Sequence, residues 1–184
     1  MILYSASLAL NAKEGVMKAV VSGTSFRPVK LPSGVKGRLF LHSMPGRRES
    51  LESVWAEMAR LGITCIACLA GPDEIDVKSR DYGYAVRERC TPCEMRSFPI
   101  PDFGVPDDDV AFWRFADDMA ALLTRGDAVL MHCGAGIGRS GTMATSVLMA
   151  LGDTLDAALR AVQAAGSHPE TPSQHSLLSS RHGR

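Results

Sequence analysis

The chain has 184 residues, of which 46% are hydrophobic and 22% charged, a composition that suits one globular domain with a buried core. Its 20 lysine and arginine residues balance its 20 aspartate and glutamate residues, which argues against a broad surface for nucleic acid or membranes. The first ten residues lack the basic start of a signal peptide, and no apolar stretch approaches transmembrane length. We therefore expect a cytoplasmic monomer that binds neither nucleic acid nor membrane.

The hydrophobic pattern alternates along the chain between the period of strands and the period of helices. Strands are expected at residues 18–21, 37–42, 63–69 and 94–100 and in a run ending at His132, and helices at 50–61, 79–88, 139–151 and 154–165, after Pro106 and after Ser173. This alternation favours an α/β fold with a mainly parallel central sheet and helices on both faces. In such folds the functional loops follow the carboxyl ends of the strands.

A glycine-rich loop follows the apolar run that ends at Met131. The sequence there reads His132-Cys133-Gly134-Ala135-Gly136-Ile137-Gly138-Arg139-Ser140. The three glycines let the backbone turn successive N–H groups toward one point. The helix that starts near Arg139 adds its own N-terminal N–H groups and the positive end of its dipole. Residues 134–139 are therefore predicted to bind phosphate, in a loop between a strand and a helix.

The side chains of this loop point to a particular chemistry. Cys133 lies at the base of the predicted anion site, where the surrounding donors stabilise its thiolate form and make it a nucleophile. Arg139 offers a planar fork that can hold two phosphoryl oxygens at once. Ser140 can hydrogen-bond the sulfur and help it leave in a second step. A buried cysteine in an ordinary strand-to-helix turn, the plainer interpretation, does not account for this combination.

The pattern His-Cys-x5-Arg-Ser at residues 132–140 resembles the signature loop of the cysteine-dependent protein tyrosine and dual-specificity phosphatases. The resemblance is clearest over residues 37–178 of a single domain spanning 1–184, with residues 1–16 and 179–184 expected to be loose. It implies a hydrolase with a phosphocysteine intermediate, no metal and no cofactor, and a loop supported by hydrogen bonds from His132. Residues 37–46 show a weaker resemblance to the kinase-associated phosphatases.

Such a reaction also needs an acid, because a departing phenolate or alkoxide requires a proton. In residues 98–106, three prolines stiffen the backbone and exclude a helix. Asp102 in this segment resembles the aspartate of the family's general-acid loop, about thirty residues before the nucleophile, and is predicted as the acid. The aspartates at 107–109 open the next helix and are predicted to cap it, with Asp107 as the second-choice acid.

A third segment, residues 170–174, is similar to the glutamine-bearing loop of the tyrosine-specific phosphatases. By this resemblance Gln174 would orient the water that hydrolyses the phosphocysteine. Two features depart from the family pattern: Glu170 stands where another glutamine is common, and residues 164–168 lack the usual basic side chains. An exposed glutamine that starts the last helix is an equally good interpretation of Gln174.

Four further cysteines have the outline of a zinc ribbon, as Cys65-x2-Cys68 and Cys90-x2-Cys93. The first pair, however, lies in a stretch expected to be a buried strand, where residues three apart point to opposite faces. Core packing is therefore the favoured role of these thiols. Zinc binding and a resolving-cysteine role stay open as alternatives.

Together these features predict a phosphomonoesterase acting on phosphotyrosine in proteins, with phosphoserine and phosphothreonine as further candidate substrates. A phosphoprotein is favoured over a phosphoinositide or another small phosphate ester because the loop spacers carry no lysine. The alternative from another class is a catalytically weak module that binds phosphoproteins through the same loop. A reactive Cys133 could in addition serve as a peroxide sensor.

Overall fold

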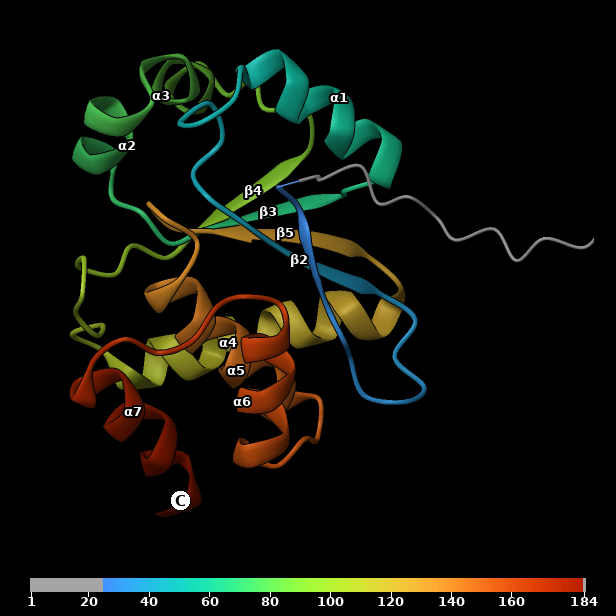
Figure 1. Cartoon of the computed structure of the whole chain (residues 1–184), viewed down its shortest axis with the longest axis vertical. Coiled ribbons are helices and arrows are strands. Elements are labelled where there is room, and N and C mark those ends of the chain that lie inside the picture. The colour runs from blue at the N-terminus through green and yellow to red at the C-terminus, as the bar shows by residue number, and fades with distance from the viewer. Residues whose placement is uncertain (1–24, 184) are drawn as a thin grey trace, which may run out of the picture.

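The computed structural model describes residues 25–183, so the short strand expected at residues 18–21 lies outside the described residues (Figure 1). The strands are β1 (Arg27–Val29), β2 (Arg38–His42), β3 (Cys65–Cys68), β4 (Glu94–Ser97) and β5 (Ala128–His132). The helices are α1 (Leu51–Leu61), α2 (Pro72–Lys78), α3 (Arg80–Arg87), α4 (Asp109–Arg125), α5 (Gly138–Ala150), α6 (Leu155–Ala164), α7 (Pro172–Ser179) and the 3-10 helix η1 (Ser180–Gly183).

The five strands form one sheet in the order β1-β2-β5-β3-β4. All neighbours are parallel except β1, which pairs antiparallel with β2 at the edge. The register places His132, the last residue of β5, beside His42 of β2 and Cys68 of β3. The carboxyl ends of three adjacent strands therefore meet directly before Cys133, which is where a parallel sheet places its functional loops.

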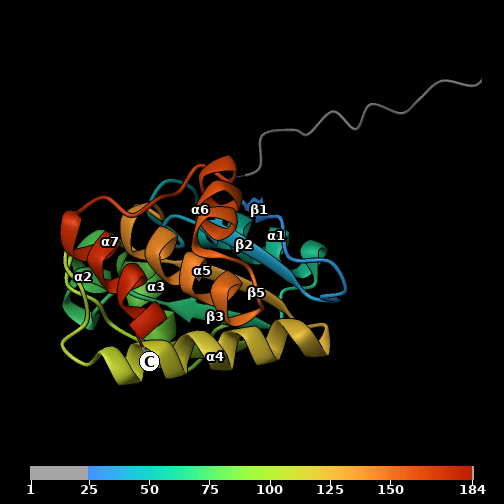
Figure 2. The same ribbon diagram turned by 90° about the horizontal axis from the view of Figure 1, so that it is seen from below.

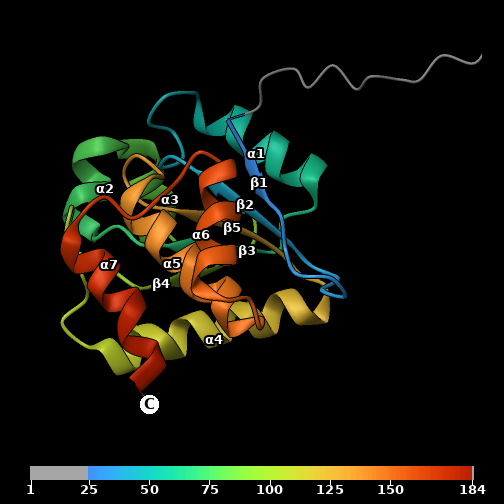
Figure 3. The same ribbon diagram turned by 60° about the horizontal axis from the view of Figure 1, so that its bottom comes forward.

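Helices cover both faces of the sheet, as the sequence predicted (Figure 3). One face packs against α4, α5, α6 and α7, which lie together in Figure 2. The other face packs against α1, with α2 and α3 beside it. The alternation of strand residues explains this arrangement: in β5, Val129 and Met131 enter the first core and Leu130 enters the second.

Besides η1, two elements were not predicted, β1 and α2, and both carry residues that contact the glycine-rich loop. The antiparallel strand β1 is only three residues long and is interrupted by Pro28, so it has no recognisable period. Helix α2 is also short, but it begins with a proline at its first position and acidic residues in its first turn, which are ordinary signals of a helix start.

Strands β3 and β4 are both shorter than expected, and for β4 the cause is the change of the backbone pattern at Pro99. Strand β4 ends at Ser97, yet Phe98 N–H still donates to Cys68 O and Ile100 N–H to Leu69 O. Pro99 has no N–H to donate, so the regular ladder stops there. The chain nevertheless stays attached to the sheet as far as Ile100, two residues before Asp102.

The cysteines in β3 lie as strand geometry requires. Cys65 packs in the core under α4 and α5, and Cys68 packs on the opposite face with Ile75 and Tyr82. Burial raises the pKa of the Cys65 thiol to about 12 and that of Cys68 to about 11. Both are therefore neutral core side chains at physiological pH.

The chain end from residue 179, expected to be loose, continues from α7 into η1. There the Arg181 guanidinium lies 4.7 Å from the ring centre of Trp113 and donates to Asp117 at 3.1 Å.

Among residues 25–183, no helix has the length and apolar character needed to cross a membrane.

Candidate active site

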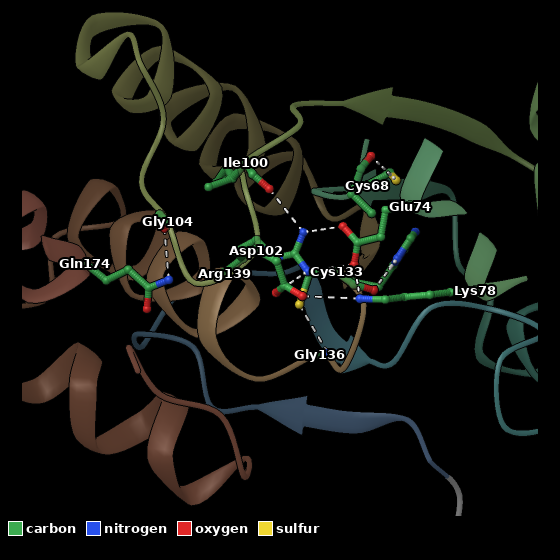
Figure 4. Close-up of polar contacts among 12 residues, drawn as sticks. Cys68, Glu74, Lys78, Ile100, Asp102, Gly104, Cys133, Gly136, Arg139 and Gln174 are labelled. Carbon is green, nitrogen blue, oxygen red and sulfur yellow. Dashed lines mark hydrogen bonds and ion pairs between the residues drawn. The ribbon is translucent and has the colours of Figure 1, made fainter. Parts of the chain in front are cut away.

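The glycine-rich loop lies between β5 and α5, and Figure 4 shows its polar surroundings. It borders a cavity of about 270 Å³. The cavity is lined by Arg47, Lys78, Asp102, Phe103, Cys133, Ala135, Gly138, Arg139 and Glu170. The structure therefore brings together Cys133, Arg139 and Asp102, the three residues to which the sequence assigned the chemistry.

The loop is braced from behind through its carbonyl groups. Met44 N–H donates to Gly134 O at 3.1 Å. Gly136 O accepts from Ser167 Oγ at 2.6 Å and from the Arg27 guanidinium. In a trans peptide the N–H points opposite to the C=O, so the N–H groups that follow these carbonyls turn away from the braces. A ring of donors on the other side of the loop is the arrangement that an anion requires.

Glycine is required at position 136 for two reasons. Its φ of +74° lies in the left-handed region, and a Cβ there would come within 2.1 Å of His42 O. The resulting turn directs Gly136 N–H at Cys133 Sγ, with a distance of 3.2 Å. The sulfur is thus stabilised by a backbone donor, and the Cys133 residue is only 2% exposed.

His132 supports the loop as a neutral side chain. Burial lowers its pKa to about 4. Its Nε2 lies 2.8 Å from the Tyr82 hydroxyl and its Nδ1 lies 3.2 Å from Cys133 O. In the neutral ring that satisfies both contacts, Nδ1–H donates to the carbonyl and Nε2 accepts from tyrosine. The predicted hydrogen-bonding support from His132 is therefore present.

Arg139 is held in place by Glu74 of α2. Its Nη1 donates to Glu74 Oε2 at 2.6 Å and its Nη2 donates to Glu74 Oε1 at 2.8 Å, a two-point contact (Figure 4). Nη1 also donates to Ile100 O at 3.1 Å. The guanidinium is 2% exposed, so its orientation is fixed before any substrate arrives.

This clamp persists across the pH range of an enzyme assay. Hydrogen bonds from Arg139 lower the pKa of the Glu74 carboxyl to about 2. Burial opposes the charge of Arg139, but the hydrogen bonds and charge of Glu74 outweigh it, and the pKa of Arg139 is raised. Because the pKa of Glu74 is depressed, the ion pair is fully formed above the ordinary carboxyl range and is lost only as the pH falls toward 2.

Asp102 lies on the loop between β4 and α4 and contacts two cations. Arg139 Nη2 donates to its Oδ1 at 2.7 Å and Lys78 Nζ to its Oδ2 at 3.3 Å. Its side chain is 51% exposed, so it can reach both the buried arginine and a ligand in the cavity. The rival aspartates do not line the cavity: Asp108 caps α4 by accepting from Ala111 N–H at 2.9 Å, as predicted.

The two supporting residues have different surroundings. The Ser140 hydroxyl is buried and has no hydrogen-bond partner within residues 25–183. Gln174 is 1% exposed, and Figure 4 shows its amide directed at Gly104, away from Glu74 and Lys78. The roles assigned to Ser140 in sulfur departure and to Gln174 in orienting water stay predictions.

Sequence reasoning missed Glu74 and Lys78. Lys78 Nζ donates to Glu74 Oε1 at 2.6 Å across one turn of α2, so the two side chains extend from one helix face toward the loop. The acidic start of α2 could have revealed the helix. No feature of the sequence near Glu74 indicates its contact with Arg139, which lies 65 residues further along the chain.

Replacing Glu74 with glutamine should lower kcat/KM on a phosphomonoester about 10- to 100-fold, because hydrogen bonds to a charged group contribute about 1.5–3 kcal/mol. Glutamine presents a single oxygen acceptor and no charge, so the two-point hold on Arg139 is lost. Steady-state kinetics would measure the change. Glu57→Gln is the matched control, since Glu57 makes a similar two-point contact with Arg60 on the surface of α1. Equal rates for the two variants would contradict the clamp.

Comparison with known proteins agrees with this geometry. Residues 30–184 match the family described as "Swiss Army Knife protein, DSP-PTPase phosphatase domain". A structure of kinase associated phosphatase (KAP), with its catalytic cysteine replaced by serine, is 20% identical with a TM-score of 0.73, covering 86% of this chain and 93% of that one. The structure of Tk-PTP in its active form is 29% identical with a TM-score of 0.64, covering 82% and 95%.

A third structure broadens the range of ligands among these relatives. PTPMT1 in complex with PI(5)P is 18% identical with a TM-score of 0.62, covering 79% of this chain and 90% of that one. At this identity the similarity shows the fold alone, as it does for KAP. The match to the family, which covers most of the chain, shows more: this protein belongs to the dual-specificity, cysteine-based phosphatases of the DSP-PTPase family.

Proposed function

We propose that this protein hydrolyses phosphotyrosine in proteins, and also phosphoserine and phosphothreonine, through a phosphocysteine intermediate. The observation that carries the proposal is that Cys133, Arg139 and Asp102 line one small cavity beside the glycine-rich loop. This set supplies a nucleophile, an anion-binding fork and an acid, which are the groups that phosphoryl transfer without a metal requires. A module that only binds phosphoproteins has no use for the acid.

In the first step Cys133 Sγ attacks phosphorus and the ester P–O bond breaks. The loop N–H groups and Arg139 hold the equatorial oxygens as the charge on them redistributes. Asp102 gives its proton to the leaving oxygen. For this, the incoming phosphoryl group must replace the Asp102 carboxylate on Arg139 Nη2, where the two lie 2.7 Å apart in the structure. Water then cleaves the P–S bond and releases phosphate and the Cys133 thiolate.

The edge of the cavity supports a phosphoprotein as the substrate. Phe103 follows Asp102 with a φ of +57° and is 62% exposed, so its ring is available to pack on an aromatic phosphoester. Arg47 is exposed on the same cavity and suits an anionic chain. Arg47 and Lys78 could equally meet a second phosphate, which keeps a phosphoinositide or another small phosphate ester as the alternative substrate class.

We also place the protein in the cytoplasm, acting as a monomer. Its five cysteines are all free, which is typical of a reducing compartment.

The proposal is tested by turnover of para-nitrophenyl phosphate in the presence of a metal chelator, followed by a comparison of tyrosine-, serine- and threonine-phosphorylated peptides with PI(5)P in vesicles. We expect chelator-resistant turnover and the highest kcat/KM on the tyrosine-phosphorylated peptides. Binding of these peptides without turnover would favour the binding module. A higher kcat/KM on PI(5)P would assign the enzyme to the lipid phosphatases.

A further inference from the structure

A second carboxylate, that of Glu170, lines the catalytic cavity together with Asp102. It lies against the end of the glycine-rich loop: a Cβ added to Gly138 would come within 2.0 Å of Glu170 Oε2 and 2.9 Å of its Cδ. Glycine at position 138 therefore leaves room for this carboxylate beside the first residue of α5. A negative charge this close to a phosphate site weakens the binding of a phosphorylated substrate. The presence of Glu170 at this position therefore needs a chemical explanation.

Glu170 has no structural duty that would explain its place. The N-cap of α7 is Thr171, whose hydroxyl accepts from Gln174 N–H at 3.3 Å, so the helix does not need the Glu170 carboxylate. Within residues 25–183 the Glu170 side chain makes no ion pair or hydrogen bond. Its oxygens are free to accept a proton from a ligand in the cavity.

The two carboxylates of the cavity differ in their charged neighbours. Asp102 contacts both cations of the site, since its Oδ1 accepts from Arg139 and its Oδ2 from Lys78. Glu170 has no such partner in the described part of the chain. The cavity therefore holds one carboxylate engaged by cations and one whose oxygens are unengaged within residues 25–183.

Gln174 connects the loops that carry these two groups. Its Oε1 accepts from Glu170 N–H at 2.7 Å, and its Nε2 donates to Gly104 O at 3.0 Å, two residues after Asp102. The Gln174 amide is thus occupied by backbone groups and does not line the cavity. Gln174 therefore acts as a positioning residue, which fixes the backbone of Glu170 relative to the loop that carries Asp102.

We propose that Glu170 is the general base of the second half-reaction, an inference that rests on the proposed phosphocysteine mechanism. The water oxygen bonds to phosphorus while the P–S bond breaks and its electron pair returns to Cys133 Sγ as a thiolate. The proton released by the water passes to the Glu170 carboxylate. Inorganic phosphate leaves, Glu170 gives this proton to solvent, and Asp102 takes up a proton from solvent, which restores both groups for the next cycle.

Glu170→Gln tests this base because it keeps the shape of the side chain and removes its ability to take a proton. In rapid mixing with para-nitrophenyl phosphate, the variant should release one equivalent of para-nitrophenolate per enzyme at the wild-type rate. Steady turnover should then fall by about 10²–10⁴-fold, the usual contribution of a general base. Acid quenching should trap one added phosphoryl group on the peptide that contains Cys133, detected by mass spectrometry. Glu88→Gln, an exposed carboxylate outside the cavity, is the matched control.

The outcomes separate this inference from the proposed function. If Glu170→Gln turns over at the wild-type rate without accumulating phosphocysteine, Glu170 is not the base. If the variant also loses the initial release of para-nitrophenolate, Glu170 acts on the first step. The assignment of Glu170 as the base of the second step is then wrong. If the wild-type enzyme shows no chelator-resistant turnover, the phosphatase proposal itself fails. Partial recovery in Glu170→Asp, which restores a carboxylate on a shorter side chain, would further support proton transfer over packing.

Discussion

Replacing Cys133 with serine should abolish turnover of para-nitrophenyl phosphate while the fold and phosphate binding survive. The hydroxyl is nearly the same size as the thiol, and Gly136 N–H, 3.2 Å from the sulfur, can still donate to it. A serine hydroxyl, however, is not ionised near neutral pH and is therefore a poor nucleophile. Nitrophenolate release measures the loss, and calorimetric titration with inorganic phosphate measures the retained site.

This result separates chemistry from structure, because a thermal melt of Cys133→Ser should match that of the wild type. The residue is 2% exposed and sits at the end of β5, so a damaged loop would lower both stability and phosphate affinity. Appreciable turnover by a correctly folded Cys133→Ser protein would show that the nucleophile lies elsewhere.

The nucleophile loop was predictable because its information is local. Nine consecutive residues specify the strand end, the turns that need glycine and the start of a helix, and each requirement is met by the residue in place. The left-handed conformation of Gly136 and the N–H directed at Cys133 Sγ both lie within that stretch. Asp102 was predicted as the acid from equally local signals. It lies in a proline-rich segment whose distance from Cys133 matches the spacing of the family's general-acid loop.

The residues that orient these groups could not be predicted because they arrive from distant parts of the chain. Glu74 and Lys78 lie on a seven-residue helix, and their contacts with Arg139 and Asp102 exist only after the sheet has formed. Arg27, on the unpredicted strand β1, braces Gly136 O across 109 positions of sequence. Helix and strand periods describe which face of an element is buried, and they carry no information about such pairings.

Residues 170–174 show that side-chain positions are hard to predict even in a segment that resembles a family motif. The resemblance drew attention to Gln174, which lies in the first turn of α7 and donates to Gly104 O. The side chain that enters the cavity is instead Glu170, which the sequence marked only as a departure from the pattern. A residue that departs from a family motif, such as Glu170, can therefore indicate which side chain of the motif faces the cavity.

Replacing Asp102 with asparagine should lower the rate on phosphotyrosine peptides by about 10²–10⁴-fold, because the basic leaving group departs without its proton. The loss on para-nitrophenyl phosphate should be smaller, since that leaving group is a weaker base. The asparagine keeps the size of the side chain and can still accept from Arg139 Nη2, so the cavity should retain its shape. Kinetics on both substrates measure the contrast, and equal losses would argue against proton donation.

The pH dependence of the same variant identifies the acid independently of the rates. A general acid works only while protonated, so activity falls as the pH rises through its ionisation, and Asp102→Asn should flatten this basic limb. The acidic limb should persist, because it reports the nucleophile or the substrate. Glu74 contributes to neither limb, since Arg139 holds its pKa at about 2. Asp107→Asn is the decisive control: Asp107 is exposed and does not line the cavity, so its variant should keep both limbs. If Asp107→Asn flattens the basic limb and Asp102→Asn leaves it unchanged, the proton comes from Asp107, and the contacts of Asp102 with Arg139 and Lys78 serve only to hold the loop.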